Sequence, residues 1–226
     1  KASVRPLSLL TAEGTTVSSG RPRAGEYILA FDPADALRFG VSQKNKKLRT
    51  LYTKTPMTET QLRAAFFDPA MLPFIAQKTL KAFADADPGG YPYYQRRLAE
   101  FQSRVDSAMS AGRRISGKKK ILDVTGAEGA WVRSAAPGVV RPPDNVWQSW
   151  LVGDTRALHA ALSEASSRGW LILLDPWTPD IIRRAAVAYP YRLTLPSPKS
   201  GSDFIGFLQD ILISISTKLA ASPTAK

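Results

Sequence analysis

The sequence predicts an α/β fold whose second half contains a parallel sheet. Three short apolar runs, at residues 120–124, 170–174 and 191–195, have the composition of strands that are covered on both faces. The segments between these runs repeat apolar residues with helical spacing, which is typical of βαβ units. We therefore expect residues 118 to 219 to form one α/β unit.

The first 65 residues are less regular. Short apolar runs predict possible strands at residues 4–10, 27–31 and 48–52. Residues 14–25 are rich in Gly, Ser, Thr and Arg, so we expect a loop there. This part of the chain predicts a small and irregular N-terminal lobe.

Two long helices are expected next. Asp68 is a good N-cap and Pro69 suits the first helical position, where its missing N–H costs nothing. That helix should end near residues 87–90, which are Asp-Pro-Gly-Gly, and a second helix should span residues 91–112. We predict three parts: a reduced N-terminal lobe (1–67), a connecting helix (68–90) and a C-terminal α/β lobe (91–226).

The C-terminal half can be divided in the same way. Residues 135–150 are rich in proline and tryptophan, so we expect a long loop. Helices are expected at 154–168, after Pro179, and at 202–219, the last with Ser202 as its N-cap.

Composition excludes several kinds of site. The 226 residues include no cysteine and one histidine, His159, so disulfides, thiolate metal sites and multi-histidine metal sites are ruled out within this chain. His159 falls in the middle of a predicted helix, where we expect a surface position. No signal-peptide segment is visible and the first residue is lysine, so we interpret the sequence as a mature or trimmed chain, which leaves export open.

The formal net charge of +12 suits an anionic partner, an anionic membrane or simple solubility. The basic residues are scattered along the chain and no basic stripe is interleaved with aromatic residues. The pattern therefore does not favour a nucleic-acid-binding surface.

Ligands of parallel sheets bind beyond the carboxyl ends of the strands. The polar and aromatic residues at those positions are the candidates for a ligand cleft: Asp123, Thr125, Glu128, Asp175, Trp177, Ser197, Ser200 and Asp203. Each also has a structural interpretation. Asp123 and Asp175 could accept loop hydrogen bonds, Glu128, expected to be the more exposed acid, could complement a helix dipole, and Trp177 could pack between lobes. No residue set is a confident metal site.

Several short motifs occur in a familiar order. They are Phe67-Asp68-Pro69, Gly117-Lys118-Lys119-Lys120, Arg168-Gly169-Trp170, Asp175-Pro176-Trp177-Thr178-Pro179 and Pro196-Ser197-Pro198. From about residue 66 to 219 the chain thereby resembles the zinc/manganese-type (cluster A-I) periplasmic solute-binding proteins of ABC importers. The resemblance implies a two-lobed fold with a long connecting helix, a periplasmic or other extracytoplasmic location, and an ABC permease of the inner membrane as partner.

The resemblance also implies a zinc or manganese site, but the corresponding positions here differ. The family's His or Glu ligand of the C-terminal lobe falls at Val124 or Thr125, its terminal Asp falls at Ser197, and no histidine precedes His159. We therefore expect that the usual ligand set is lost and leave the ligand, and any cofactor, unknown.

Three functions remain open. The first is a non-enzymatic solute-binding protein, or a degenerate relative, that binds a ligand between its lobes without the His-rich metal site. The second is an interaction module, without a transport role, whose basic surface binds an anionic partner or membrane. The third is an α/β enzyme that uses Asp123, Glu128 and Asp175, although no nucleophile or cofactor motif accompanies them.

Overall fold

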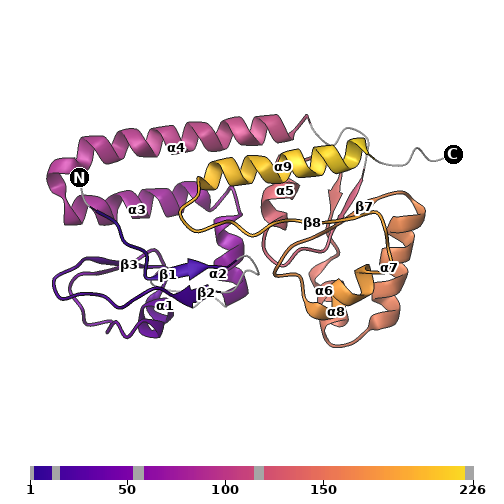
Figure 1. Cartoon of the computed structure of the whole chain (residues 1–226), viewed down its shortest axis with the longest axis horizontal. Helices are drawn as coiled ribbons and strands as arrows, with labels where there is room; N and C mark the ends of the chain where they lie inside the picture. The colour runs from indigo at the N-terminus through magenta and orange to yellow at the C-terminus, as the bar shows by residue number, and fades with distance from the viewer. Residues whose placement is uncertain (1–2, 12–15, 53–58, 115–119, 222–226) are drawn as a thin grey trace.

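The computed structural model describes residues 3–11, 16–52, 59–114 and 120–221. Two lobes lie side by side, and helices α3, α4 and α9 run along the top of both in the view of Figure 1. The lobe formed by the first part of the chain is the smaller. The α/β class and the two-lobed arrangement predicted from the sequence are confirmed.

The C-terminal lobe is built on a four-stranded parallel sheet with the order β6-β5-β7-β8. The three strands predicted from apolar runs are present, each one or two residues shorter than expected. The strands of this sheet are β5 (Ile121–Asp123), β6 (Val139–Val140), β7 (Leu171–Leu174) and β8 (Arg192–Thr194).

Helices cover both faces of this sheet. Along β7, Leu171 and Leu173 pack in one apolar cluster, whereas Ile172 and Leu174 pack in the other, because successive side chains of a strand point to opposite faces. The first cluster lies under α4 (Tyr91–Gly112), α5 (Gly129–Ala135) and α9 (Phe204–Ala220). The second lies under α6 (Asp144–Leu151), α7 (Thr155–Ser167) and α8 (Asp180–Ala186).

Two expectations for this lobe are wrong. The predicted loop at residues 135–150 contains β6 and most of α6, and Trp147 and Trp150 are buried residues of α6. The prolines stand ahead of α6, with Pro143 as its N-cap, so they mark its start and do not prevent it. The N-cap of α9 is Asp203, whose carboxylate accepts from the N–H of Ile205, and not Ser202.

The N-terminal lobe contains two separate pairs of strands. The antiparallel pair lies partly in the predicted loop 14–25, so that expectation is wrong for its second strand. The elements of this lobe are β1 (Ser8–Leu10), β2 (Thr16–Ser18), the parallel pair β3 (Ile28–Ala30) and β4 (Leu48–Thr50), α1 (Pro33–Arg38) and α2 (Glu59–Phe66).

Helices α3 (Leu72–Ala86) and α4 pack against each other, and α4 continues over α5 and α9. The helix was expected to start at Asp68, but α3 begins later, at Leu72. Residues 69–71 form turns, and the carboxylate of Asp68 accepts a hydrogen bond there from the N–H of Ala70. The predicted end of α3 and both ends of α4 are confirmed. The lobe boundaries at residues 67 and 90 stay predictions.

Candidate functional site

The carboxyl ends of β5, β7 and β8 meet at one edge of the C-terminal sheet, because the three strands are parallel neighbours. Asp123 ends β5, Asp175 directly follows β7, and Ser197 lies three residues beyond β8. All three are buried, and so are Thr125 and Glu128. Trp177, whose N–H donates to Asp175, lies at this edge as well, so the structure brings six of the eight candidate residues there, five of them buried.

Asp175 joins two loops. Its carboxylate accepts hydrogen bonds from the backbone N–H groups of Gly126, Ala127 and Glu128, at 2.8, 2.7 and 3.0 Å. It also accepts from the N–H of Trp177 at 3.1 Å and from the Thr178 hydroxyl at 2.9 Å. These five donors use the acceptor capacity of the carboxylate, so Asp175 fixes the loop after β5 onto the turn after β7.

Asp123 is equally occupied. Its Oδ1 accepts from the N–H and the hydroxyl of Thr125, at 2.9 and 2.7 Å. Its Oδ2 forms ion pairs with Arg133 and, at 3.4 Å, with Arg141. Arg141 also donates to the carbonyl oxygen of Thr125 and lies 4.2 Å from the ring centroid of Trp147. Two guanidinium groups therefore neutralise this buried carboxylate.

Glu128 differs from both aspartates. Its side chain is 0% exposed, and neither carboxyl oxygen has a hydrogen-bond partner among the residues that the structure describes. Burial, with a further contribution from the negative charge of Asp175, raises the pKa of Glu128 to about 9. The carboxyl is therefore protonated at neutral pH, and the expectation that Glu128 is the more exposed acid is wrong.

The two glycines beside Glu128 explain this burial. A Cβ atom at Gly126 would lie 2.1 Å from the carbonyl oxygen of Trp177, and one at Gly129 would lie 2.2 Å from Oδ2 of Asp123. Close backbone approach thus requires glycine at both positions. The loop folds inward and carries the Glu128 side chain into the protein.

Trp177 and Ser197 lie where the two lobes meet. The ring of Trp177 is half-buried and its centroid lies 5.7 Å from that of Phe67, which also contacts Phe204 and Phe207. The hydroxyl of Ser197 donates to the carbonyl oxygen of Thr11, at 3.1 Å, just beyond β1. Both residues therefore connect the strand ends to the N-terminal part of the chain.

Ser200 and Asp203 are exposed and lie outside the buried group. Asp203 caps α9 and forms an ion pair with Arg104. A hydrogen bond from the Arg104 guanidinium lowers the pKa of Asp203 below its usual value.

The N-terminal lobe contributes two buried polar groups that sequence reasoning missed. Oδ2 of Asp32, just after β3, and the hydroxyl of Tyr52, just after β4, are buried, and neither atom has a hydrogen-bond partner in the described part of the chain. Burial, and then the negative charge of Asp68, raises the pKa of Tyr52. Asp32 directly follows the predicted strand at 27–31, and Tyr52 is the last residue of the predicted strand at 48–52, so both positions could have been identified from the sequence.

Metal-ligand geometry is not evident in the part of the chain that the structure describes. Within those ranges no group of three or more His, Cys, Asp or Glu side chains could hold a metal ion. His159 is exposed on α7, as predicted. No helix among the described residues is long and apolar enough to span a membrane.

No family model matches the sequence, and no curated protein matches it significantly. Solved structures, in contrast, share its fold. The solute-binding protein FpvC of P. aeruginosa, solved with Ni²⁺, is 12% identical, with a TM-score of 0.55 over 92% of this chain and 86% of its own. The laminin-binding protein Lbp of Streptococcus pyogenes is 14% identical, with a TM-score of 0.53 over 81% of this chain and 73% of its own.

A periplasmic metal-binding protein of Candidatus Liberibacter asiaticus is 15% identical, with a TM-score of 0.50 over 80% of this chain and 74% of its own. These similarities establish that the chain has the fold of the periplasmic metal-binding type of solute-binding protein. The fold expected from the ordered motifs is thereby confirmed.

Proposed function

We propose that this chain is a non-enzymatic solute-binding protein of a metal-type ABC importer. It holds a ligand in the cleft between its lobes, outside the cytoplasm, and delivers it to a permease in the inner membrane. The fold supports this proposal, because the similar solved structures are described as binding proteins. Fold alone does not set a function, so the proposal depends on the residues at the strand ends.

The observation that carries it is the Glu128 carboxyl. A buried polar group without a partner is costly, and native proteins retain few of them. This one lies after β5, at the sheet edge where ligands of such sheets bind. A ligand that hydrogen-bonds to the carboxyl would remove that cost.

The neighbouring side chains limit the kind of ligand. Asp123 and Asp175 already have their hydrogen bonds and ion pairs, so they are not free to coordinate a cation. Glu128 is neutral near pH 7, and a neutral carboxyl is a poor metal ligand but both donates and accepts hydrogen bonds. We infer a polar ligand, held by Glu128 from one lobe and by Asp32 or Tyr52 from the other.

The hydrogen bonds and ion pairs of Asp123 and Asp175 also argue against the enzymatic alternative. General acid–base catalysis needs two carboxyl groups that are free to exchange protons with a substrate. Of the three buried acids at this edge, only Glu128 has free oxygens.

Calorimetric titration with zinc, manganese and ferrous salts tests the proposal. We expect no submicromolar binding of any of them to the wild type at pH 7, because the described residues form no tetrahedral or octahedral ligand set. Submicromolar binding of zinc that is lost in Glu128→Gln, and retained in the exposed control Glu164→Gln, would show instead that the metal site is intact. Permease and ATPase genes beside this gene would support the transport role.

A further inference from the structure

The N-terminal lobe contains a broad, open hollow of about 1120 Å³. Its walls come from residues 20–28, which lead into β3, and from residues 37–47, which lead from α1 into β4. The hollow therefore lies at the amino ends of these two parallel strands. The ligand cleft proposed above lies at their carboxyl ends, so the two sites are separate.

Cations dominate the lining of the hollow. One acid, Glu26, lines it, and this carboxylate already accepts from Arg5 at 2.7 Å and from the N–H of Arg23 at 2.8 Å. The hydrogen bond from Arg23 and, to a smaller extent, that from Arg5 lower the pKa of Glu26. The carboxylate therefore stays ionised and bound to these two donors. The cations that line the hollow, which we call the basic basin, are Arg21, Arg23, Arg38, Lys44 and Lys47.

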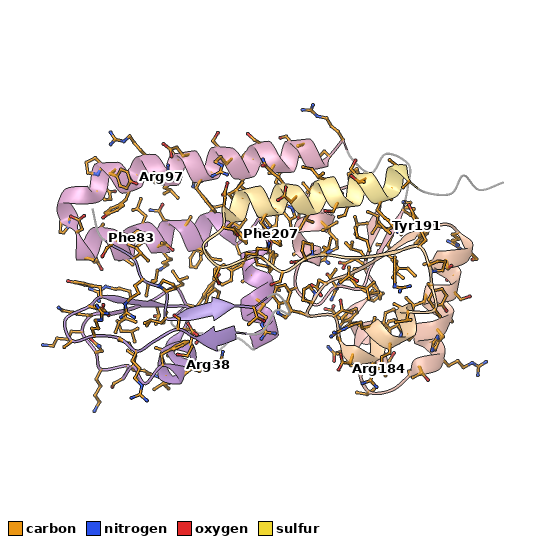
Figure 2. The ribbon with its side chains drawn as sticks, in the orientation of Figure 1. Arg38, Phe83, Arg97, Arg184, Tyr191 and Phe207 are labelled. Atoms are coloured by element: carbon orange, nitrogen blue, oxygen red, sulfur yellow. The ribbon has the colours of Figure 1, made fainter. Side chains whose placement is uncertain are left out.

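Four of these five side chains have no hydrogen bond or ion pair with the described residues. Lys47 donates to the carbonyl oxygen of Gly25 at 2.7 Å, whereas within the described ranges the side chains of Arg21, Arg23, Arg38 and Lys44 make neither, although the charge of Arg23 acts on nearby Glu26. All four are exposed. Figure 2 shows Arg38 at the lower edge of the N-terminal lobe, on α1.

An exposed apolar residue stands among these cations. Leu37, directly before Arg38, lines the basin and is 55% exposed. Tyr27, at the start of β3, is 46% exposed and lies beside Lys47. Exposed apolar and aromatic side chains next to Lys and Arg are the composition of surfaces that lie in a membrane interface.

We propose that the basic basin docks the protein on an anionic lipid bilayer by binding the phosphate groups of its lipids. Guanidinium groups pair with phosphate oxygens in a bidentate way, and a cluster of cations is attracted to an anionic leaflet. Stacking of nucleic-acid bases would need free aromatic faces. Phe39, the one aromatic residue of the lining, packs against the lobe's own core, and the ring of Tyr27 beside the basin already contacts Lys47 and Arg49. This inference goes beyond the proposed function and does not depend on the ligand cleft.

Vesicle sedimentation with the full chain tests the docking surface. Vesicles of phosphatidylcholine with phosphatidylglycerol are compared with vesicles of phosphatidylcholine alone. The wild type should bind only the anionic vesicles, and added salt should weaken that binding. Arg38→Glu with Lys44→Glu should reduce the partition coefficient at least about thirtyfold, and the same two residues changed to Gln should give a smaller loss.

The matched control is Arg156→Glu with Arg184→Glu. It changes the net charge equally, at exposed and unpartnered arginines of α7 and α8 in the other lobe, where Figure 2 labels Arg184. It should lower binding far less than the basin variant. Circular dichroism melts verify that every variant is folded.

Three results would overturn the proposal. They are equal losses in the basin and control variants, no binding of the wild type to anionic vesicles, and basin-dependent binding of inorganic phosphate or duplex DNA without vesicle binding. The last result would assign the basin to a soluble anion or to nucleic acid instead of a bilayer.

Discussion

The strand ends of the C-terminal lobe and the basic basin of the N-terminal lobe hold their charged side chains in opposite ways. The C-terminal lobe buries Asp123, Glu128 and Asp175 completely, and two of these three have their oxygens bonded to backbone N–H groups, hydroxyls or arginines. The basic basin leaves cations such as Arg23 and Lys44 exposed, and their side chains have no hydrogen bond or ion pair with the described residues. Buried charge in one lobe therefore fixes the chain, whereas exposed charge in the other is available to a partner.

A substitution should lower the free energy of unfolding according to the buried polar groups that it leaves without hydrogen-bond partners. Removing a buried acceptor leaves several donors without partners, and each costs about 1–3 kcal/mol. Removing an exposed cation leaves only water contacts. Three substitutions, from the largest expected effect to the smallest, test this ranking.

Asp175→Ala should have the largest effect. It leaves the N–H groups of Gly126, Ala127 and Glu128 without their acceptor and releases the loop after β5. We expect the free energy of unfolding to fall by about 3–5 kcal/mol, measured by urea denaturation. Asp210→Ala, at an exposed position of α9, is the control, and an equally small loss in both variants would refute the structural role of Asp175.

Glu128→Gln should change how stability depends on pH. The folded-state pKa of Glu128, about 9, exceeds the ordinary value of 4.5. Between these two pH values the folded protein therefore keeps a proton on Glu128 that the unfolded chain releases. The contribution of Glu128 to stability is therefore greatest below pH 4.5 and is lost progressively up to pH 9. Glutamine cannot ionise, so the variant should lack this decline.

Near pH 7 the variant should be more stable than the wild type by about 2–3 kcal/mol, relative to their difference at pH 4. Thermal melts across this pH range measure the difference. Glu164→Gln, at an exposed ion pair with Arg168, should leave the pH profile unchanged. Parallel profiles for wild type and Glu128→Gln would show that Glu128 is ionised in the folded protein.

Arg23→Gln combined with Lys44→Gln should have the smallest effect. Both side chains are exposed and unpartnered, so we expect the free energy of unfolding to change by less than about 0.5 kcal/mol. Urea denaturation beside Asp175→Ala gives the comparison directly. A loss above about 1 kcal/mol would mean that these cations hold the N-terminal lobe together, and the contrast between the lobes would fail.

The sequence predicted the parallel sheet well because its strands carry their own signal. Residues 120–124 and 170–174 are apolar on both faces, and this pattern needs no knowledge of distant contacts. The segment 135–150 was misjudged because its prolines, which precede α6, dominate the local composition. Local composition does not reveal that Trp147 and Trp150 pack in the apolar core beneath α6, α7 and α8.

The sequence predicted which residues lie at the strand ends, but it did not predict how these residues are buried and hydrogen-bonded. Glu128 was expected to be the more exposed acid, whereas Trp177 and Asp123 approach the glycines on either side of it and it lies buried. The five donors around Asp175 come from two loops separated by nearly fifty residues. Burial and hydrogen bonding of this kind follow from tertiary packing, which periodicity cannot report.

The contact between Ser197 and Thr11 bears on the order in which the chain folds. The two residues are 186 positions apart, so their hydrogen bond closes nearly the whole chain into a loop, which is entropically costly and slow to form. Phe204 and Phe207 follow in α9 and supply two of the three aromatic rings that lie against Phe67 within the described chain. The apolar contact between the lobes is therefore complete only when α9 has packed against both of them.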